Sequence, residues 1–293
     1  MGEIRKMHTR TVIGLPAAYN QDESLDTKST VRYLRYLQDE GAATVMTTAG
    51  TSHFNLLNLE EIHTLNQTVA QSFDGEKILG VPALSIMEAA TFVERSNEYI
   101  DSSCRLMFLY PERFYNEAVI VDYMSRLREH TNNKIYIHGK TIRCATGGTW
   151  DYNASVINAL YERNVLQGIK EEHSSLAKSY DFVSRINPKV DVIVAGGSMR
   201  RYEYLRSAGA NSFLAGVGNL FPRIERAYLN GQIDDPLGKE KQMFDVFMKY
   251  GWHKSLRIAL KYLDLTCYHD RSPWPEPTPS EVEEITQVVE RIR

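Results

Sequence analysis

The sequence lacks several features that would mark other classes of protein. No run of about 18 apolar residues is present, so nothing in it predicts a transmembrane helix. The first ten residues, MGEIRKMHTR, are polar and lack the apolar core of a signal peptide. Acidic residues outnumber basic ones, 37 to 34, so no excess of positive charge indicates nucleic acid as a partner. We therefore expect no membrane and no nucleic acid, and a small-molecule partner.

Cysteine is scarce and metal-binding motifs are missing. The three cysteines, Cys104, Cys144 and Cys267, are too scattered for a disulfide framework, and a reducing cytoplasm is the expected compartment. Neither HxH nor HExxH occurs. Three histidines fall near predicted strand ends without any spacing typical of ligands: His53, His138 and His173. We predict that the protein holds no metal.

Short apolar runs alternate with amphipathic segments through most of the chain. The predicted strands cover residues 11–19, 43–50, 77–83, 105–110, 133–139, 164–170, 191–197 and 211–218. A predicted helix follows each of them, which makes eight units within about 230 residues. That number predicts an α/β fold, a (β/α)₈ TIM barrel, rather than an open doubly wound sheet, because no GxGxxG follows the first strand.

The end of the chain differs in pattern. Beyond residue 230 only helices are predicted, over about 236–249, 253–264 and 280–292, with the proline-rich segment RSPWPEPTPS before the last. We therefore predict a barrel over residues 1–230 and a C-terminal helical domain over 231–293.

Catalytic groups in such barrels lie at the carboxyl ends of the strands, and this rule selects Lys170. Lys170 ends the apolar run NVLQGIK, and two glutamates follow it. An amine that is partly shielded from water is more readily neutral, and a neutral amine can form a Schiff base with a carbonyl compound. The alternative is a lysine at the rim of the barrel that pairs with Glu171 or Glu172.

Other residues at predicted strand ends suggest two different sites. Tyr136, in KIYIHG, could relay protons to the amine or be a core tyrosine. The segment AGTSH, residues 49–53, could bind a carboxylate or be an ordinary turn. The alternative is a phosphate-binding site, as in a phosphosugar isomerase or epimerase. It would be formed by the glycines at 196–197 and 216–218, with Arg200 and Arg201.

Several of these pieces occur in one order and resemble the dihydrodipicolinate synthase/N-acetylneuraminate lyase family. They are the loop GTS followed by LNLEE, the tyrosine of KIYIHG, the lysine of GIKEE and the glycines of AGG. The resemblance covers essentially the whole chain, and GIKE is its most specific piece. It implies a Schiff-base lysine at 170, a proton-relay phenol at Tyr136, and a carboxylate held by Thr51 and the Ser52 amide. Gly50 and Gly196 fall beside these binding positions.

The resemblance also implies a function. Family members are barrels with a C-terminal helical domain that act on pyruvate or a related 2-oxo acid, and are commonly tetramers. We therefore expect a Schiff-base aldolase or lyase that makes or breaks a carbon–carbon bond with an aldehyde. We expect no cofactor, since the covalent imine on Lys170 would activate the substrate. We also expect a homo-oligomer, either a dimer or a tetramer.

Three positions depart from the family pattern. The usual G-[TS]-T-G-E reads Ala49-Gly50-Thr51-Ser52-His53, so one hydroxyl and the acid are missing. After the fourth strand, Tyr110 and Tyr115 both occur, and neither matches cleanly the tyrosine that enters a neighbouring subunit. The loop GKTIRCATGGTWD is longer than usual, and Arg143 is its candidate for a second carboxylate. These departures leave two alternatives open, a sibling enzyme and a non-catalytic barrel that binds keto acids.

Overall fold

The computed structural model describes residues 9–266 and 269–293, so the polar start of the chain and Cys267 lie outside the described residues. Eight strands close into a parallel barrel in the order β1-β10-β9-β8-β5-β4-β3-β2, which confirms the predicted (β/α)₈ architecture. Their bounds are β1 Arg10–Gly14, β2 Thr44–Met46, β3 Glu76–Val81, β4 Cys104–Phe108, β5 Lys134–Gly139, β8 Gly168–Glu171, β9 Asp191–Val194 and β10 Ser212–Leu214.

Helices follow the strands of the barrel and continue beyond it. Those that alternate with strands are α1 Thr27–Asp39, α2 Leu59–Ser72, α3 Ile86–Ser96, α4 Glu117–Arg128, α5 Ala154–Glu162, α6 Leu176–Arg185, α7 Ser198–Leu205 and α8 Pro222–Leu229. The C-terminal part contains α9 Asp234–Tyr250, α10 Trp252–Tyr262 and α11 Pro279–Ile292. Within the described ranges, no helix is both long and apolar enough to cross a membrane.

Side-chain caps begin many of these helices, which is why the boundaries could be predicted closely. Asn58, Ser85 and Thr278 each accept a hydrogen bond from the third helical residue, a glutamate that reaches back to the cap. Such a capping box satisfies two of the amides that a helix start leaves without partners. The loop after β5 holds an element that the sequence did not predict, a small antiparallel pair of β6 Ile142–Arg143 and β7 Thr149–Trp150.

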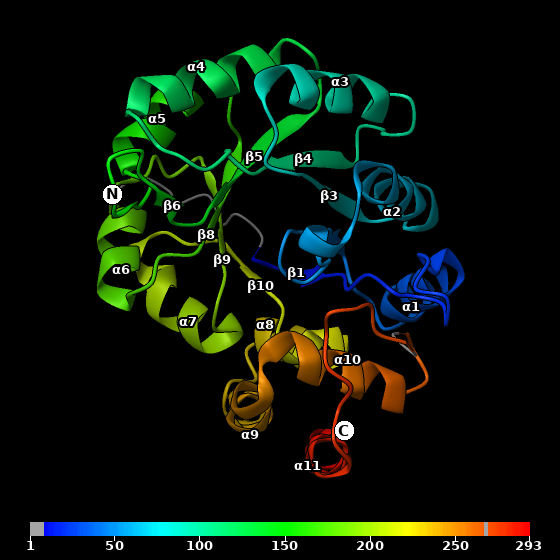
Figure 1. Cartoon of the computed structure of the whole chain (residues 1–293). Helices are drawn as coiled ribbons and strands as arrows, with labels where there is room; N and C mark the ends of the chain where they lie inside the picture. The colour runs from blue at the N-terminus through cyan, green and yellow to red at the C-terminus, as the bar shows by residue number, and fades with distance from the viewer. Residues whose placement is uncertain (1–8, 267–268) are drawn as a thin grey trace. The chain divides into compact units, whose positions relative to one another are not determined.

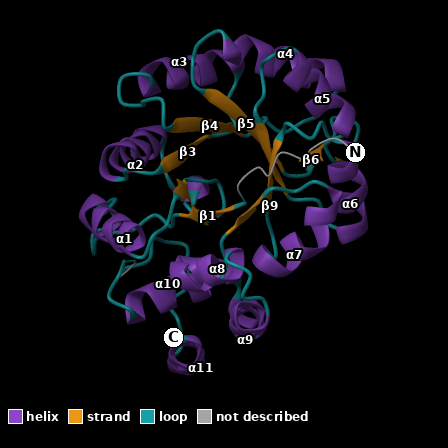
Figure 2. Ribbon diagram, turned by 180° about the vertical axis from the view of Figure 1, so that it is seen from behind, coloured by secondary structure: helices purple, strands orange, loops and turns teal. Residues whose placement is uncertain are grey.

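The chain divides into two compact units. One unit holds Ile78–Leu214 and the segment that ends at Val12, and the other holds Ile13–Lys77 and Ala215–Arg293. In the first unit, helices α3 to α7 lie outside strands β4, β5, β8 and β9 (Figures 1 and 2). In the second, α9, α10 and α11 pack on one another.

The register of the first unit decides which side chains meet inside it. On β5 and β8, Tyr136 pairs with Gly168, and His138 pairs with Lys170. A Cβ at Gly168 would lie 2.2 Å from the ring of Tyr136, so glycine is required for the ring to lie across the neighbouring strand. The glycine of GIKE therefore serves packing, and it puts the tyrosine one layer below the lysine.

Candidate active site

Lys170 lies inside the barrel, on β8, and not at its outer rim. Its relative exposure is 3%, and Nζ lies 2.7 Å from His138 Nε2 and 2.7 Å from Glu172 Oε2. His138 Nε2 in turn lies 2.5 Å from Glu172 Oε2, so the three atoms form a compact triangle. A proton that leaves the amine thus has an imidazole nitrogen and a carboxylate oxygen as immediate acceptors.

The two partners of the amine differ in their surroundings. The His138 ring is buried, and its Nδ1 has no hydrogen-bond partner among the residues that the structure describes. The ring therefore makes its polar contacts through Nε2. The side chain of Glu172 is 41% exposed, so its carboxylate lies between the buried amine and solvent. Glu172 is thus a polar group that contacts both the buried amine and solvent.

The electrostatics of the triangle keep His138 neutral and Glu172 charged. Burial lowers the pKa of His138 to about 4, and the charge of Lys170 acts in the same direction against the opposing effect of Glu172. Burial raises the pKa of Glu172, but the charge of Lys170 and the hydrogen bond with His138 outweigh burial and leave this pKa well below its usual range. Near neutral pH the imidazole is therefore an acceptor of protons, and the carboxylate is an anion.

Tyr136, the predicted proton relay, lies elsewhere. Its hydroxyl donates to Asp191 Oδ2 at 2.7 Å, and that carboxylate also accepts from Arg10 at 2.5 Å and Ser212 at 2.9 Å. Asp191 and Ser212 begin their strands, so this network lies at the amino end of the barrel strands, opposite to the catalytic end. The structure places His138, two residues further along β5, beside the amine instead.

A conservative substitution separates these two placements. Tyr136→Phe is expected to lower the free energy of unfolding by about 1–3 kcal/mol, because it removes a buried hydrogen bond to a carboxylate. Imine formation on Lys170 is expected to stay within about twofold of the wild type, because the hydroxyl does not reach Nζ. Urea denaturation and borohydride trapping measure the two effects, and a fall of 100-fold in trapping would restore the relay role to Tyr136.

The loop predicted to hold a carboxylate is only partly available for that role. The Ser52 amide donates to the Thr48 carbonyl at 3.0 Å, and the Ser52 hydroxyl donates to Leu15 O at 2.6 Å. In this structure both donors of Ser52 are therefore used within the fold itself, and its role in binding a carboxylate stays a prediction. The hydroxyl of Thr48 is buried and has no hydrogen-bond partner within residues 9–266 and 269–293. The side chain of Thr51 is also buried. The hydroxyl of Thr48 is therefore the group of this loop that remains available to bind a ligand.

The two positions in this loop that depart from the family pattern lie near aromatic and imidazole rings. A Cβ at Gly50 would lie 3.4 Å from the ring of His253, which is an ordinary van der Waals contact, so α10 lies close to the loop here without excluding a side chain. His53 adopts a left-handed backbone with φ of 53° and stacks on Trp274, with ring centroids 4.7 Å apart. Burial, followed by the charges of Arg257 and His253, lowers the pKa of His53 to about 3. A buried neutral histidine thus replaces the acid.

Arg143 and Gly196 occupy the loops that follow β5 and β9. The side chain of Arg143 is 78% exposed, and its Nε lies 3.6 Å from Glu112 Oε2. A substrate carboxylate that bound to Arg143, as the sequence predicted, would therefore have to compete with Glu112. Gly196 has a left-handed φ of 71°, which favours glycine, and it lies one residue before Gly197, the N-cap of α7.

The glycine loops that suggested a phosphate grip are already occupied by side chains of the protein. The amides of Gly216 and Gly218 both donate to Glu225 Oε1 at 2.9 Å, and Glu225 is fully buried. Arg201 contacts Glu171, the carbonyl of His173 and the hydroxyl of Ser179. Because a buried carboxylate fills the place of an anion, this arrangement disfavours a phosphosugar enzyme.

Metal ligands and reactive thiols are not gathered near the amine. Among the described residues, no group of three or more histidine, cysteine, aspartate or glutamate side chains could hold a metal. Cys104 is a buried cysteine, and Cys144 is a half-buried one in the loop after β5.

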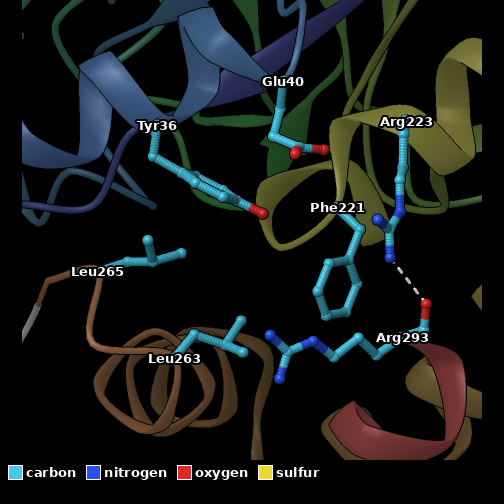
Figure 3. Close-up of a pocket in the computed structure, with 7 residues that line it drawn as sticks. All are labelled: Tyr36, Glu40, Phe221, Arg223, Leu263, Leu265 and Arg293. Atoms are coloured by element: carbon cyan, nitrogen blue, oxygen red, sulfur yellow. Dashed lines mark hydrogen bonds between the residues drawn. The ribbon is translucent and has the colours of Figure 1, made fainter.

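The described residues form several hollows away from the lysine. One of about 680 Å³ lies beside α5 and α6 and is lined by Trp150, Lys178 and Arg185 among others. Another, of about 150 Å³, is shown in Figure 3, where Arg223 donates to the carbonyl oxygen of Arg293. Neither of these two hollows contains Lys170.

The triangle includes two residues whose role the sequence did not reveal. In the sequence, His138 is one of three histidines near predicted strand ends, and Glu172 is a possible partner of a lysine at the rim of the barrel. The sequence signal that could have found His138 is its spacing from Tyr136. The two residues are two positions apart on β5, just as Gly168 and Lys170 are on β8, with which they pair. Either residue of β5 could have been the one at the level of the amine.

Comparisons with known proteins agree with this fold. A model of the dihydrodipicolinate synthetase family matches residues 7–292. Dihydrodipicolinate synthase from Oceanobacillus iheyensis superposes with a TM-score of 0.81 at 18% identity, over 98% of this chain and 97% of that one. N-acetylneuraminate lyase from Fusobacterium nucleatum gives 0.82 at 15% identity, over 97% and 99%. No curated protein matches the chain in sequence. A fold shared over the full length, a family match over nearly all of it and a buried lysine in GIKE lead to one conclusion: the chain belongs to the dihydrodipicolinate synthetase family.

Proposed function

We propose that the protein is a Schiff-base aldolase or lyase in which Lys170 forms an imine with pyruvate or a related 2-oxo acid. The observation that carries the proposal is the buried amine, whose Nζ lies 2.7 Å from both His138 and Glu172. A lysine that served only as a rim charge would not be 3% exposed with a neutral imidazole against its nitrogen. The enamine formed from the imine then adds to an aldehyde, or is released when the reverse reaction cleaves one.

The residues of the triangle account for each proton in imine formation. The lone pair of Nζ forms a bond to the carbonyl carbon, and the carbonyl oxygen takes up a proton. That oxygen leaves as water when the carbon–nitrogen double bond forms. Nζ gives up two protons, one when the ammonium ion becomes the neutral nucleophile and one after the bond to carbon has formed. His138 Nε2 accepts each in turn and passes it to the carbonyl oxygen, so both protons of the leaving water are accounted for and the iminium nitrogen keeps one proton and the positive charge. Its low pKa, about 4, keeps the imidazole free to accept a proton near neutral pH.

The remaining parts of the proposal come from family resemblance. Thr51 would hold the carboxylate of the 2-oxo acid, as the family pattern implies, and the spare hydroxyl of Thr48 adds a donor to the same loop. The acceptor is an aldehyde. The protein would act in the cytoplasm as a homodimer or homotetramer, and Tyr115, which is 68% exposed, is a candidate for a subunit contact.

Trapping of the imine tests the proposal directly. Protein incubated with pyruvate and borohydride is expected to gain a stable adduct on the tryptic peptide that contains Lys170, as detected by mass spectrometry. The hydride reduces the imine to a secondary amine that cannot be hydrolysed. Absence of an adduct at high pyruvate, and with other 2-oxo acids, would contradict the proposal. An adduct without turnover over a panel of aldehydes would favour a barrel that binds keto acids but has lost catalysis.

A further inference from the structure

A carboxylate of the protein itself touches the nitrogen that would become the imine. Glu172 Oε2 lies 2.7 Å from Lys170 Nζ, and its side chain reaches there from the residue after β8. Glu171, its neighbour, points to the other side of the strand, where it accepts from His173, Ser179 and Arg201. The two consecutive glutamates therefore have separate tasks, and only Glu172 faces the amine.

The charge balance at this nitrogen is complete before any substrate binds. Lys170 contributes one positive charge, Glu172 one negative charge, and His138 is neutral near pH 7. An iminium ion carries the same positive charge on the same nitrogen as the ammonium ion that it replaces. The carboxylate can thus stabilise the iminium without moving, because the ion pair keeps its sign and its position.

A 2-oxo acid brings a second carboxylate to the same nitrogen. In an imine, atoms bonded to the carbonyl carbon lie about 2.5 Å from the nitrogen, as standard bond lengths require. The carboxylate of a bound 2-oxo acid would then share the iminium with Glu172, and the two like charges would repel each other. An uncharged carbonyl compound avoids this repulsion, because the Glu172 carboxylate is then the single anion beside the iminium cation.

We propose that Glu172 is the counter-ion of the iminium on Lys170, and that the site therefore accepts carbonyl compounds that carry no carboxylate beside the carbonyl group, such as hydroxyketones. This inference rests on the proposed function, because it requires an imine on Lys170. It widens the class of substrate beyond 2-oxo acids and gives Glu172 a catalytic role, since its oxygen contacts the reacting nitrogen. In the step itself, nitrogen gains a bond to carbon, oxygen leaves as water, and the positive charge stays on nitrogen.

A pair of substrates that differ mainly in charge tests the inference. Wild-type protein and Glu172→Gln are treated with pyruvate or with uncharged hydroxyacetone in the presence of cyanoborohydride, which reduces iminium ions selectively. The adduct on the Lys170 peptide is then quantified by mass spectrometry. Gln has the shape of Glu without its charge, and Glu162→Gln, an exposed residue of α5, is the matched control for loss of one negative charge.

Wild-type protein is expected to trap both compounds on Lys170. Glu172→Gln is expected to lower hydroxyacetone trapping about tenfold or more, because an opposite charge in contact is worth at least that factor. Pyruvate trapping should fall much less, because pyruvate supplies its own anion, so the ratio of the two adducts changes. Glu162→Gln should leave the ratio unchanged.

Two results would overturn the inference while leaving the proposed function intact. One is trapping of pyruvate by the wild type with no hydroxyacetone adduct, and the other is an equal change for both compounds in Glu172→Gln. Loss of both adducts in the wild type would instead reject the imine itself, and with it the inference. Thermal unfolding checks that the variant is folded. If Glu172→Gln is not folded, Glu172→Asp, which retracts the carboxylate, must shift the ratio in the same direction.

Discussion

Lys170→Met is expected to abolish imine formation and to slow the exchange of the pyruvate methyl protons in D₂O about 10,000-fold or more, to the uncatalysed rate. Exchange requires the enamine, and the enamine requires a nitrogen that Met does not provide. Proton NMR measures this loss without any knowledge of the aldehyde partner. Persistent exchange above the uncatalysed rate would show that another group activates the keto acid.

The same variant has a second readout that does not depend on activity. The charge of Lys170 is one of the causes that hold the pKa of His138 down at about 4, after burial. Its removal is therefore expected to raise the pKa of His138 toward the ordinary value, as measured by NMR titration of the imidazole. Lys178→Met, on the exposed face of α6, removes a lysine of the same unit and should leave both readouts unchanged.

His138→Gln is the second large effect. Enamine formation is expected to fall about 100-fold or more, because a positioned general base typically contributes that factor or a larger one. Trapping of an imine on Lys170 should persist at long incubation, because the nucleophile itself remains. Slow exchange with retained trapping thus separates a proton carrier from a nucleophile. If exchange remained within threefold of the wild type, the relay would have to be another group.

The same histidine makes stability depend on pH. Its pKa in the folded protein, about 4, lies below the ordinary value of 6.5. As the pH falls from 6.5, the unfolded chain binds a proton that the folded protein does not, so stability is lost by up to about 1.4 kcal/mol per pH unit. His138→Gln is expected to show a smaller loss than the wild type, and the part that remains comes from the buried His53, whose pKa is also lowered. Urea denaturation at pH 6.5 and pH 5 measures the difference, above the range where Glu172 titrates.

The order of strands and helices could be predicted from the sequence because its causes are local. Apolar runs, amphipathic spacing and capping residues such as Asn58 and Thr278 act within a few residues along the chain. The eightfold alternation then leaves a closed parallel barrel as the solution that pairs every strand. The small β6–β7 pair was missed because its strands are two residues long and carry no apolar alternation.

Site residues could be predicted only to the level of a strand end. A period of two along a strand says which side chains point inward, but not which layer of the barrel each one occupies. That layer depends on the register between β5 and β8, which pairs His138 with Lys170 and Tyr136 with Gly168. The hydroxyl of Tyr136 then donates to Asp191. Similarly, Ser52 and the glycines near Glu225 had the composition of binding loops, but their amides are used inside the fold.

The sequence by itself determined the barrel, the helical C-terminal part and the lysine for which we propose an imine. Only the tertiary structure decided which groups touch that lysine, because contacts between strands depend on register and on packing over long separations in the chain. His138 and Glu172 reach Nζ from 32 and 2 residues away, and a shift of one layer would have put Tyr136 there instead.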